Sequence, residues 1–281
     1  MKVPSGEYYR GMNPVRDKNF ESSGRPSGGV SNGMKETRII MGMPIEIVLP
    51  AADVATKETL EAAFNYLISV DERFSTYKES SEISRINRGE LALAEASTEM
   101  KEVFALAEKT KQETNGYFDI RRPDGSIDPS GIVKGWAILH TAALVKAAGY
   151  ENYFVNAGGD IAMNGQNAKG EEWSVGIRNP FTINEIIKVV YPHGKGIATS
   201  GSYIRGDHIY NPHAPEEKIQ EIMSITVIGP DVLEADRFAT AAFAMGKGGI
   251  AFIESLPGFE AYSIDHKGIA TMTSGFGTYV K

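Results

Sequence analysis

The sequence predicts an α+β fold in which mixed, largely antiparallel sheets pack against helices. Some segments have apolar residues at helical spacing, others are short and rich in β-branched residues, and the two kinds do not alternate regularly along the chain. The 281 residues are 42% hydrophobic and 23% charged, which is ordinary for a globular protein with a sizeable core. A regular series of βαβ units is therefore not expected.

The first 34 residues are expected to form a flexible or strap-like tail, and residues 35–281 to form a single domain. Glycine, serine and proline are frequent up to about residue 32, and no hydrophobic period is present there. The next segment, 38–50, alternates and contains β-branched residues, so it is expected to be a strand. Gly42 within this segment indicates that another group approaches the backbone closely.

Helices are expected where apolar residues recur at helical spacing. This pattern covers 53–74 and 98–114, which predicts two amphipathic helices, and Ser81 between them is expected to cap a short helical turn. A third helix is expected over 131–149, because Gly149 is a natural residue just beyond a helix C-terminus.

The remaining segments are mostly strands. β-Branched and aromatic residues predict strands over 153–156, 173–177, 187–191 and 222–228. The order is completed by a buried helix around Asp236, a short helix over 250–256, and two closing strands around Tyr262 and Ala270. No internal repeat is found.

Charge and cysteine content exclude several functions. A net charge of −7 and a pI near 5.4 argue against a nucleic-acid surface, which needs clustered Lys and Arg. The absence of cysteine excludes disulfides, thiolate metal sites and a cysteine nucleophile. The N-terminal region lacks the apolar stretch of a signal peptide, and no run is long enough to span a bilayer, so we expect no membrane insertion and a cytoplasmic location.

Asp236 and Thr240 are the most informative residues of the chain. They lie four positions apart in a run that otherwise reads as the apolar face of a buried helix, so both side chains point the same way. Carboxylate and hydroxyl oxygens suit Mg²⁺, which usually keeps several waters or substrate phosphates. The pair predicts half of a metal site. The alternative is that Asp236 caps or starts the helix and Thr240 bonds back to an upstream carbonyl.

A second candidate site lies at the expected start of the third helix. Gly131 frees the backbone there, the amide groups and helix dipole attract anions, and Lys134 adds a positive charge. These features predict a phosphate site, although the Walker A pattern is absent. A helix that is merely capped by Asp128 or Ser130 is the alternative.

Three weaker signals remain. The hydroxyl-rich segment 74–89 could hold a planar ring or a phosphate, or could be a capped surface loop. Segment 158–160, Gly-Gly-Asp, is either a tight turn or a backbone surface for a ligand. His208 is a candidate base, with a packing role as its alternative. No nucleophile elbow surrounds Ser200 and no dinucleotide-binding glycine motif follows the first strand, so a serine triad and a Rossmann dehydrogenase are disfavoured.

Taken in order, these motifs resemble the ApbE-like flavin transferases, the FAD:protein FMN transferases. The resemblance covers about 38–246, and its specificity lies in the order of eight motifs. They are Met41-Gly42-Met43, Phe74-Ser75-Thr76-Tyr77 with the Ser81 to Asn87 segment, Gly116-Tyr117-Phe118-Asp119, the Asp128 to Gly135 segment, Gly158-Gly159-Asp160, Thr199-Ser200-Gly201, His208-Ile209-Tyr210-Asn211-Pro212, and Ala235-Asp236 with Thr240.

The resemblance implies a fold of two intimately associated subdomains and a specific reaction. In that reaction a Ser or Thr hydroxyl of a target flavoprotein attacks the FMN-side phosphorus of FAD, AMP leaves, and Mg²⁺ is the cofactor. The implied metal ligands are Asp236, Thr240 and the backbone oxygen of Gly131, and the implied catalytic residues are Asp236 and His208, the latter as base or hydroxyl positioner. The implied FAD-contacting residues are Met41, Tyr77, Tyr117, Phe118, Asp119, Asp128, Lys134 and Tyr210.

The chain also departs from the family pattern. Asn211 stands where an aspartate is common, which removes a charge near His208, and Pro129 is unusual before the helix. Segment 118–128 is short, so one wall of the ligand pocket is expected to be reduced. Two alternative functions follow, namely an FAD pyrophosphatase that uses water as acceptor and a non-catalytic FAD-binding or carrier protein.

Overall fold

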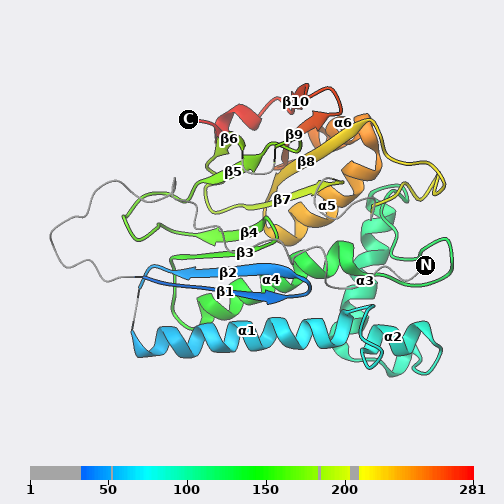
Figure 1. Ribbon diagram of the computed structural model, residues 1–281, viewed down its shortest axis with the longest axis horizontal. Helices are drawn as coiled ribbons and strands as arrows, with labels where there is room; N and C mark the ends of the chain where they lie inside the picture. The colour runs from blue at the N-terminus through cyan, green and yellow to red at the C-terminus, as the bar shows by residue number, and fades with distance from the viewer. Residues whose placement is uncertain (1–32, 52, 183–184, 203–208) are drawn as a thin grey trace.

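A large antiparallel sheet organises the computed structural model, which describes residues 33–51, 53–182, 185–202 and 209–281. Its strands run in the order β1-β2-β3-β4-β7-β8-β9-β10, and β5 and β6 form a separate hairpin (Figure 1). The strands are β1 (Met34–Ile40), β2 (Met43–Leu49), β3 (Tyr153–Ala157), β4 (Asp160–Asn164), β5 (Val175–Arg178), β6 (Ile186–Val190), β7 (Gly196–Gly201), β8 (Ile222–Gly229), β9 (Glu260–Asp265) and β10 (Ala270–Met272). The predicted α+β class is thus confirmed.

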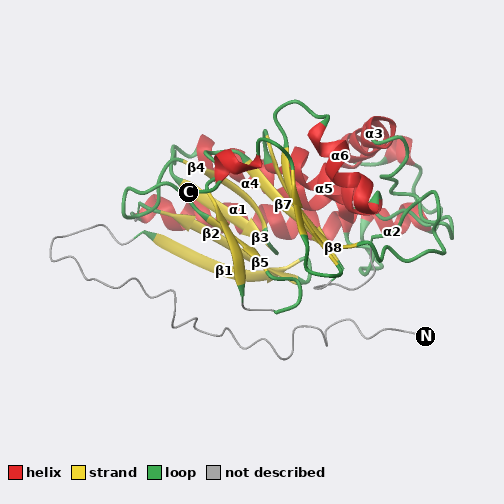
Figure 2. Ribbon diagram, turned by 90° about the horizontal axis from the view of Figure 1, so that it is seen from above, coloured by secondary structure: helices red, strands yellow, loops and turns green. Residues whose placement is uncertain are grey.

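The helices lie on one side of this sheet, as Figure 2 shows. They are α1 (Val54–Phe74), α2 (Glu82–Asn87), α3 (Thr98–Glu113), α4 (Ser130–Ala147), α5 (Val232–Ala244) and α6 (Gly249–Glu254), with short 3₁₀ turns η1 (Leu93–Glu95), η2 (Gly246–Gly248) and η3 (Phe276–Tyr279). Among the residues with described positions, no helix is both long and apolar enough to cross a membrane.

Two apolar clusters join the helices to the sheet. The first packs α1 and α4 onto β2 and β3 through side chains such as Ile47, Phe64 and Ile138. The second packs α5 and α6 onto β8 and β9 through side chains such as Val227, Phe238 and Ile253. Because α4 and α5 also pack on each other, the two halves of the sheet share one helical layer.

The opposite face of the sheet is covered by the β5–β6 hairpin and η3. A third cluster there joins Ile177 of β5, Val190 of β6 and Phe276 of η3 to residues of the central strands. β8 is therefore apolar on both faces, with Val227 in the helix-side cluster and Ile228 in the hairpin-side cluster. This double burial explains why 222–228 reads as a continuous apolar run.

The expected single strand over 38–50 is wrong. The segment is a hairpin in which Ile40 pairs with Met43, and Met41 and Gly42 form the turn with φ of 53° and 69°. Two successive residues with positive φ are what a tight hairpin turn needs, but methionine rarely adopts this conformation. The Met-Gly pair therefore gives a weak turn signal, and alternation continues on both sides of it.

Other elements match the expectations more closely. The helices over 54–74, 98–113 and 130–147 are confirmed, Ser81 caps α2 by accepting the Ser84 amide, and Gly149 follows α4 with φ of 95°. Strands β4 and β7 are not predicted by the sequence, because β4 directly follows the Gly158-Gly159 pair and β7 both begins and ends at glycine, which is typical of turns. The alternative that Asp236 starts its helix is wrong, since Asp231 caps α5 by accepting the Glu234 amide.

Candidate active site

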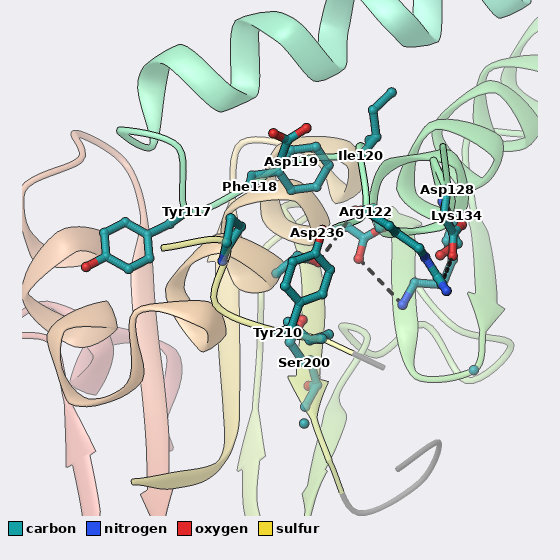
Figure 3. Close-up of a pocket in the computed structure, with 18 residues that line it drawn as sticks. Tyr117, Phe118, Asp119, Ile120, Arg122, Asp128, Lys134, Ser200, Tyr210 and Asp236 are labelled. Carbon is teal, nitrogen blue, oxygen red and sulfur yellow. Dashed lines mark hydrogen bonds and ion pairs between the residues drawn. The ribbon is translucent and has the colours of Figure 1, made fainter. Parts of the chain in front are cut away.

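A pocket opens where the loop after α3, the start of α4, the middle of α5 and the end of β7 meet (Figure 3). Nine of the twelve predicted catalytic, metal-binding and FAD-contacting residues line it, and they come from four separate stretches of the chain. They are Tyr117, Phe118, Asp119, Asp128, Gly131, Lys134, Tyr210, Asp236 and Thr240. The pocket is also lined by Arg122, Gly158, Ser200 and Gly201, among others.

Two buried carboxylates flank Lys134, which lines the pocket together with one of them, Asp236. Asp236 is 2% exposed, and its Oδ1 lies 3.5 Å from Lys134 Nζ. Asp160, at the start of β4, is fully buried, forms an ion pair with the same ammonium group and accepts the Thr199 amide at 3.0 Å. Burial raises the pKa of the Asp236 carboxyl well above its usual range, Lys134 opposes this rise and Asp160 adds to it. Two carboxylates thus share one cation.

Asp236 is held by close contact between α4 and α5. Its Oδ2 accepts the Gly135 amide at 2.8 Å, although the two residues are 101 positions apart in the sequence. A Cβ atom on Gly135 would lie 2.7 Å from Asp236 Cβ and 3.0 Å from the Leu233 Cα atom. Gly135 is therefore what allows the two helices to approach closely enough for Asp236 to face Lys134.

Gly135→Ala is expected to destabilise the protein by about 1–3 kcal/mol, because the added methyl group overpacks the α4–α5 contact. At an exposed helix position the same substitution would instead stabilise the protein, since alanine has a higher helix propensity than glycine. Urea unfolding measures the change. Gly248→Ala is the matched control, because the atom nearest to its added Cβ would be Met245 Cβ at 3.9 Å. An unchanged or raised urea midpoint in Gly135→Ala would contradict the close-contact role.

Thr240 and Gly131 complete the oxygen donors at this end of the pocket. Thr240 Oγ1 lies 3.4 Å from the Gly131 carbonyl oxygen, toward which it donates. The donors are thus a carboxylate, a hydroxyl and a backbone carbonyl, which are the hard oxygen ligands that Mg²⁺ accepts. No group of three or more His, Cys, Asp or Glu side chains that could hold a metal occurs among the described residues. A cation at this position would therefore be held by one carboxylate, that of Asp236, together with neutral protein oxygens and the oxygens of a bound ligand.

The loop after α3 forms one wall of the pocket. Thr114 ends the helix, and its hydroxyl accepts the Phe118 amide at 3.1 Å. Asp119 forms an ion pair with Lys111 at 2.7 Å. The Tyr210 hydroxyl donates to the Arg121 carbonyl at 3.0 Å, so segment 209–212 is tied to the same wall.

Asp128 is fixed by its neighbours on both sides. Its carboxylate forms an ion pair with Arg122 and accepts the Ser130 amide at 3.0 Å. The Asn87 side chain brackets the preceding residue, Ile127, with bonds of 2.9 Å to its carbonyl and 2.8 Å from its amide. Asn87, in α2, therefore places the segment that carries Asp128.

The structure does not bring every predicted residue to the pocket. Met41 sits in the β1–β2 turn and Tyr77 is 87% exposed, and neither lines the pocket. Their contact with FAD stays a prediction. His208 lies outside the described residues, and its role is likewise untested.

Two charged residues next to the predicted site residues are not among those that the sequence predicts. The sequence marks Asp160 only as part of a Gly-Gly-Asp segment, yet it is the second carboxylate at Lys134. The signal for it was an acidic residue directly after a glycine hairpin turn, where a ligand can approach. Arg122 lines the pocket beside Asp128 and gave no motif of its own.

A sequence model of the ApbE family matches residues 41–122 and 121–263. The chain belongs to the ApbE family. Among similar curated proteins, the FAD:protein FMN transferase of Klebsiella pneumoniae (strain 342) is 29% identical over 68% of this chain and 54% of its own length. That of Escherichia coli (strain K12) is 32% identical over 52% of this chain and 44% of its own. The chain thus spans about half the length of these relatives.

Solved structures of ApbE proteins share the fold. The flavin transferase ApbE from Vibrio cholerae superposes with a TM-score of 0.77 at 24% identity, over 89% of this chain and all of that one. The ApbE protein from Thermotoga maritima superposes with a TM-score of 0.80 at 21% identity over the same shares. At these identities the likeness establishes the fold.

Proposed function

We propose that this protein transfers the FMN moiety of FAD to a Ser or Thr hydroxyl of a target flavoprotein, forming a phosphoester bond and releasing AMP. The observation that carries the proposal is the convergence of Asp236, Thr240 and the Gly131 carbonyl with Lys134 in one pocket. The names of the relatives, FAD:protein FMN transferases, support the same reaction.

The charge balance of the pocket supports a divalent cation. Three carboxylates line it, those of Asp119, Asp128 and Asp236, against the two lining cations Arg122 and Lys134. Lys134 is already shared with the buried Asp160. A pyrophosphate would bring further negative charge into this setting, and a cation would offset the repulsion. Mg²⁺ fits best, because every donor is an oxygen and substrate phosphates can fill the remaining positions.

Asp236, Thr240 and the Gly131 carbonyl would hold the Mg²⁺ ion. When bound, the ion supplies charge stabilisation at the phosphoryl oxygens. Lys134 would keep the carboxylate pair oriented and add positive charge near the phosphates. The start of α4 favours anions next to Gly131.

The reaction breaks one phosphoanhydride bond and makes one phosphoester bond. The acceptor oxygen attacks the FMN-side phosphorus, the bond from that phosphorus to the bridging oxygen breaks, and AMP leaves with the bridging oxygen. The hydroxyl proton passes to a base, for which His208 is the candidate. The chain's own residues chiefly position the reactants and offset charge, which is the usual basis of phosphoryl-transfer catalysis.

His208→Ala is expected to keep FAD binding and to lower FMN transfer by about 100-fold, because a positioned base typically contributes that much. Flavin fluorescence titration and the initial rate of AMP release measure the two effects. His193→Ala is the matched control, since His193 pairs with Glu172 near η3 and away from the pocket. Unaltered transfer in His208→Ala would assign the proton to another group.

One assay separates this function from its two alternatives. The full chain is incubated with FAD and Mg²⁺, with and without an acceptor domain that carries a flavinylation site, and AMP and FMN are separated chromatographically. AMP that forms only with acceptor supports transfer. AMP and free FMN in equal amounts without acceptor would indicate a pyrophosphatase, and bound but intact FAD would indicate a binding protein.

A further inference from the structure

Arg237 follows Asp236 on α5, but its side chain does not line the pocket and instead contacts α3. It is 2% exposed, and its guanidinium group lies over the Phe238 ring at 4.0 Å from the ring centroid. Nε and Nη2 donate to the two oxygens of Glu234 at 2.8 and 2.5 Å. Burying an arginine is costly unless its charge is paired. The residues that pair with Arg237 therefore show which elements its side chain holds together.

The third guanidinium nitrogen of Arg237, Nη1, reaches the last turn of α3. Nη1 forms an ion pair with Glu113 and donates to Thr110 Oγ1 at 3.2 Å. The Thr110 carbonyl in turn accepts the Thr114 hydroxyl at 2.7 Å. Both threonines are completely buried. Arg237 thus fixes the end of α3, from which the pocket wall begins.

The Thr114 hydroxyl links the end of α3 to Phe118. Its hydroxyl donates to Thr110 and accepts the Phe118 amide, so both of its hydrogen-bonding functions are used. Phe118 is 4% exposed, and its ring lies against Gly131, where an added Cβ would be 3.3 Å from Phe118 Cε2. The same Cβ would be 3.3 Å from Thr240 Cγ2. Gly131 is therefore confined between the Phe118 ring and Thr240.

We propose that Thr114, anchored by Arg237, is a positioning residue that holds Phe118 against Gly131 and so shapes the wall of the FAD pocket. Without the Thr114 hydroxyl, the Phe118 amide would lose its buried partner and the ring would no longer be held on Gly131. Arg237, Thr110 and Thr114, none of which lines the pocket, thereby connect α5, which carries Asp236, to the pocket wall at Phe118. The inference rests on the proposed function, because the consequence is expressed in FAD binding.

The test compares Thr114→Val with two controls in the full chain. Valine keeps the shape of threonine and removes the hydroxyl, whereas Thr114→Ser retains the hydroxyl. Thr141→Val makes the same change at a buried threonine of α4 whose hydroxyl donates only to the Ala137 carbonyl at 2.7 Å. Three quantities are measured for each variant: the FAD dissociation constant with Mg²⁺ present, hydrogen exchange of the Phe118 amide without FAD, and the thermal midpoint.

Thr114→Val is expected to raise the FAD dissociation constant at least about fivefold and to speed exchange at Phe118 by a similar factor or more. Thr114→Ser should recover most of the affinity, and Thr141→Val should bind FAD as the wild type does even where its thermal midpoint falls. Once FAD is bound, the turnover number of Thr114→Val should change less than its KM does.

Two results would overturn the positioning role. One is Phe118 exchange and FAD affinity in Thr114→Val equal to those of the wild type. The other is a loss of affinity in Thr141→Val as large as that in Thr114→Val, which would reduce the effect to general destabilisation. A wild-type chain that binds no FAD would instead contradict the proposed function, and the exchange rates alone would then decide whether Thr114 holds Phe118.

Discussion

Replacing Asp236 by asparagine is expected to lower Mg²⁺-dependent FAD turnover by at least about 100-fold, because a metal ion contributes several kcal/mol of charge stabilisation. Asparagine keeps the shape of the side chain and an oxygen that can accept the Gly135 amide. It removes the negative charge that would hold the cation. The fold should therefore survive while the metal-dependent step is lost, and Asp236→Ala should lose activity as completely.

The measurement is the initial rate of AMP release over a range of Mg²⁺ concentrations. Asp231→Asn is the matched control, because Asp231 caps the same helix and asparagine is an equally good capping residue. The control should retain wild-type turnover and the same Mg²⁺ dependence. Wild-type rates in Asp236→Asn would remove Asp236 from the metal site.

Removing the charge of Lys134 is expected to cost about 3–5 kcal/mol of unfolding free energy, because a buried ion pair that loses one partner leaves an uncompensated charge. In Lys134→Met, both Asp160 and Asp236 would lose their shared ammonium group. Urea unfolding of the purified variant measures the loss. Lys146→Met is the control on the same helix, where an exposed lysine in the last turn should contribute less than about 1 kcal/mol.

Combining Lys134→Met with Asp160→Asn separates stability from catalysis. The second change removes one of the unpaired buried carboxylates, so the double variant should be more stable than Lys134→Met alone. Its FAD turnover should stay low, because the positive charge near the phosphates is still missing. A double variant that is no more stable than Lys134→Met would show that the two charges do not compensate each other.

The sequence predicts the fold well where local periodicity reflects burial. Helices α1 and α3 have an apolar stripe and a capping residue, and α4 is a long apolar run followed by Gly149, so the approximate bounds of all three follow from the residues. The Met41-Gly42 turn could not be predicted in the same way, because it depends on a methionine in a conformation that its neighbours impose.

In the candidate site, too, residues marked by a local sequence pattern could be predicted, whereas residues whose partners lie on other elements could not. Asp236 and Thr240 could be singled out because oxygen-bearing side chains interrupt an apolar helix. The partnership of Asp236 with Gly135 joins positions far apart in the chain, and only the packing of α4 on α5 creates it. Asp160 and Arg237 were missed for the same reason, since the partners that give them a role lie on other elements.

The most direct measurement of the proposed function is the mass of an acceptor domain after incubation with the purified protein, FAD and Mg²⁺. The proposed function predicts a mass increase of one FMN moiety on the acceptor Ser or Thr, equimolar AMP, and no adduct when that residue is replaced by alanine or when Mg²⁺ is chelated. An unmodified acceptor, with FAD converted to free FMN and AMP or left intact and bound, would contradict it, provided that a relative named FAD:protein FMN transferase modifies the same acceptor under the same conditions.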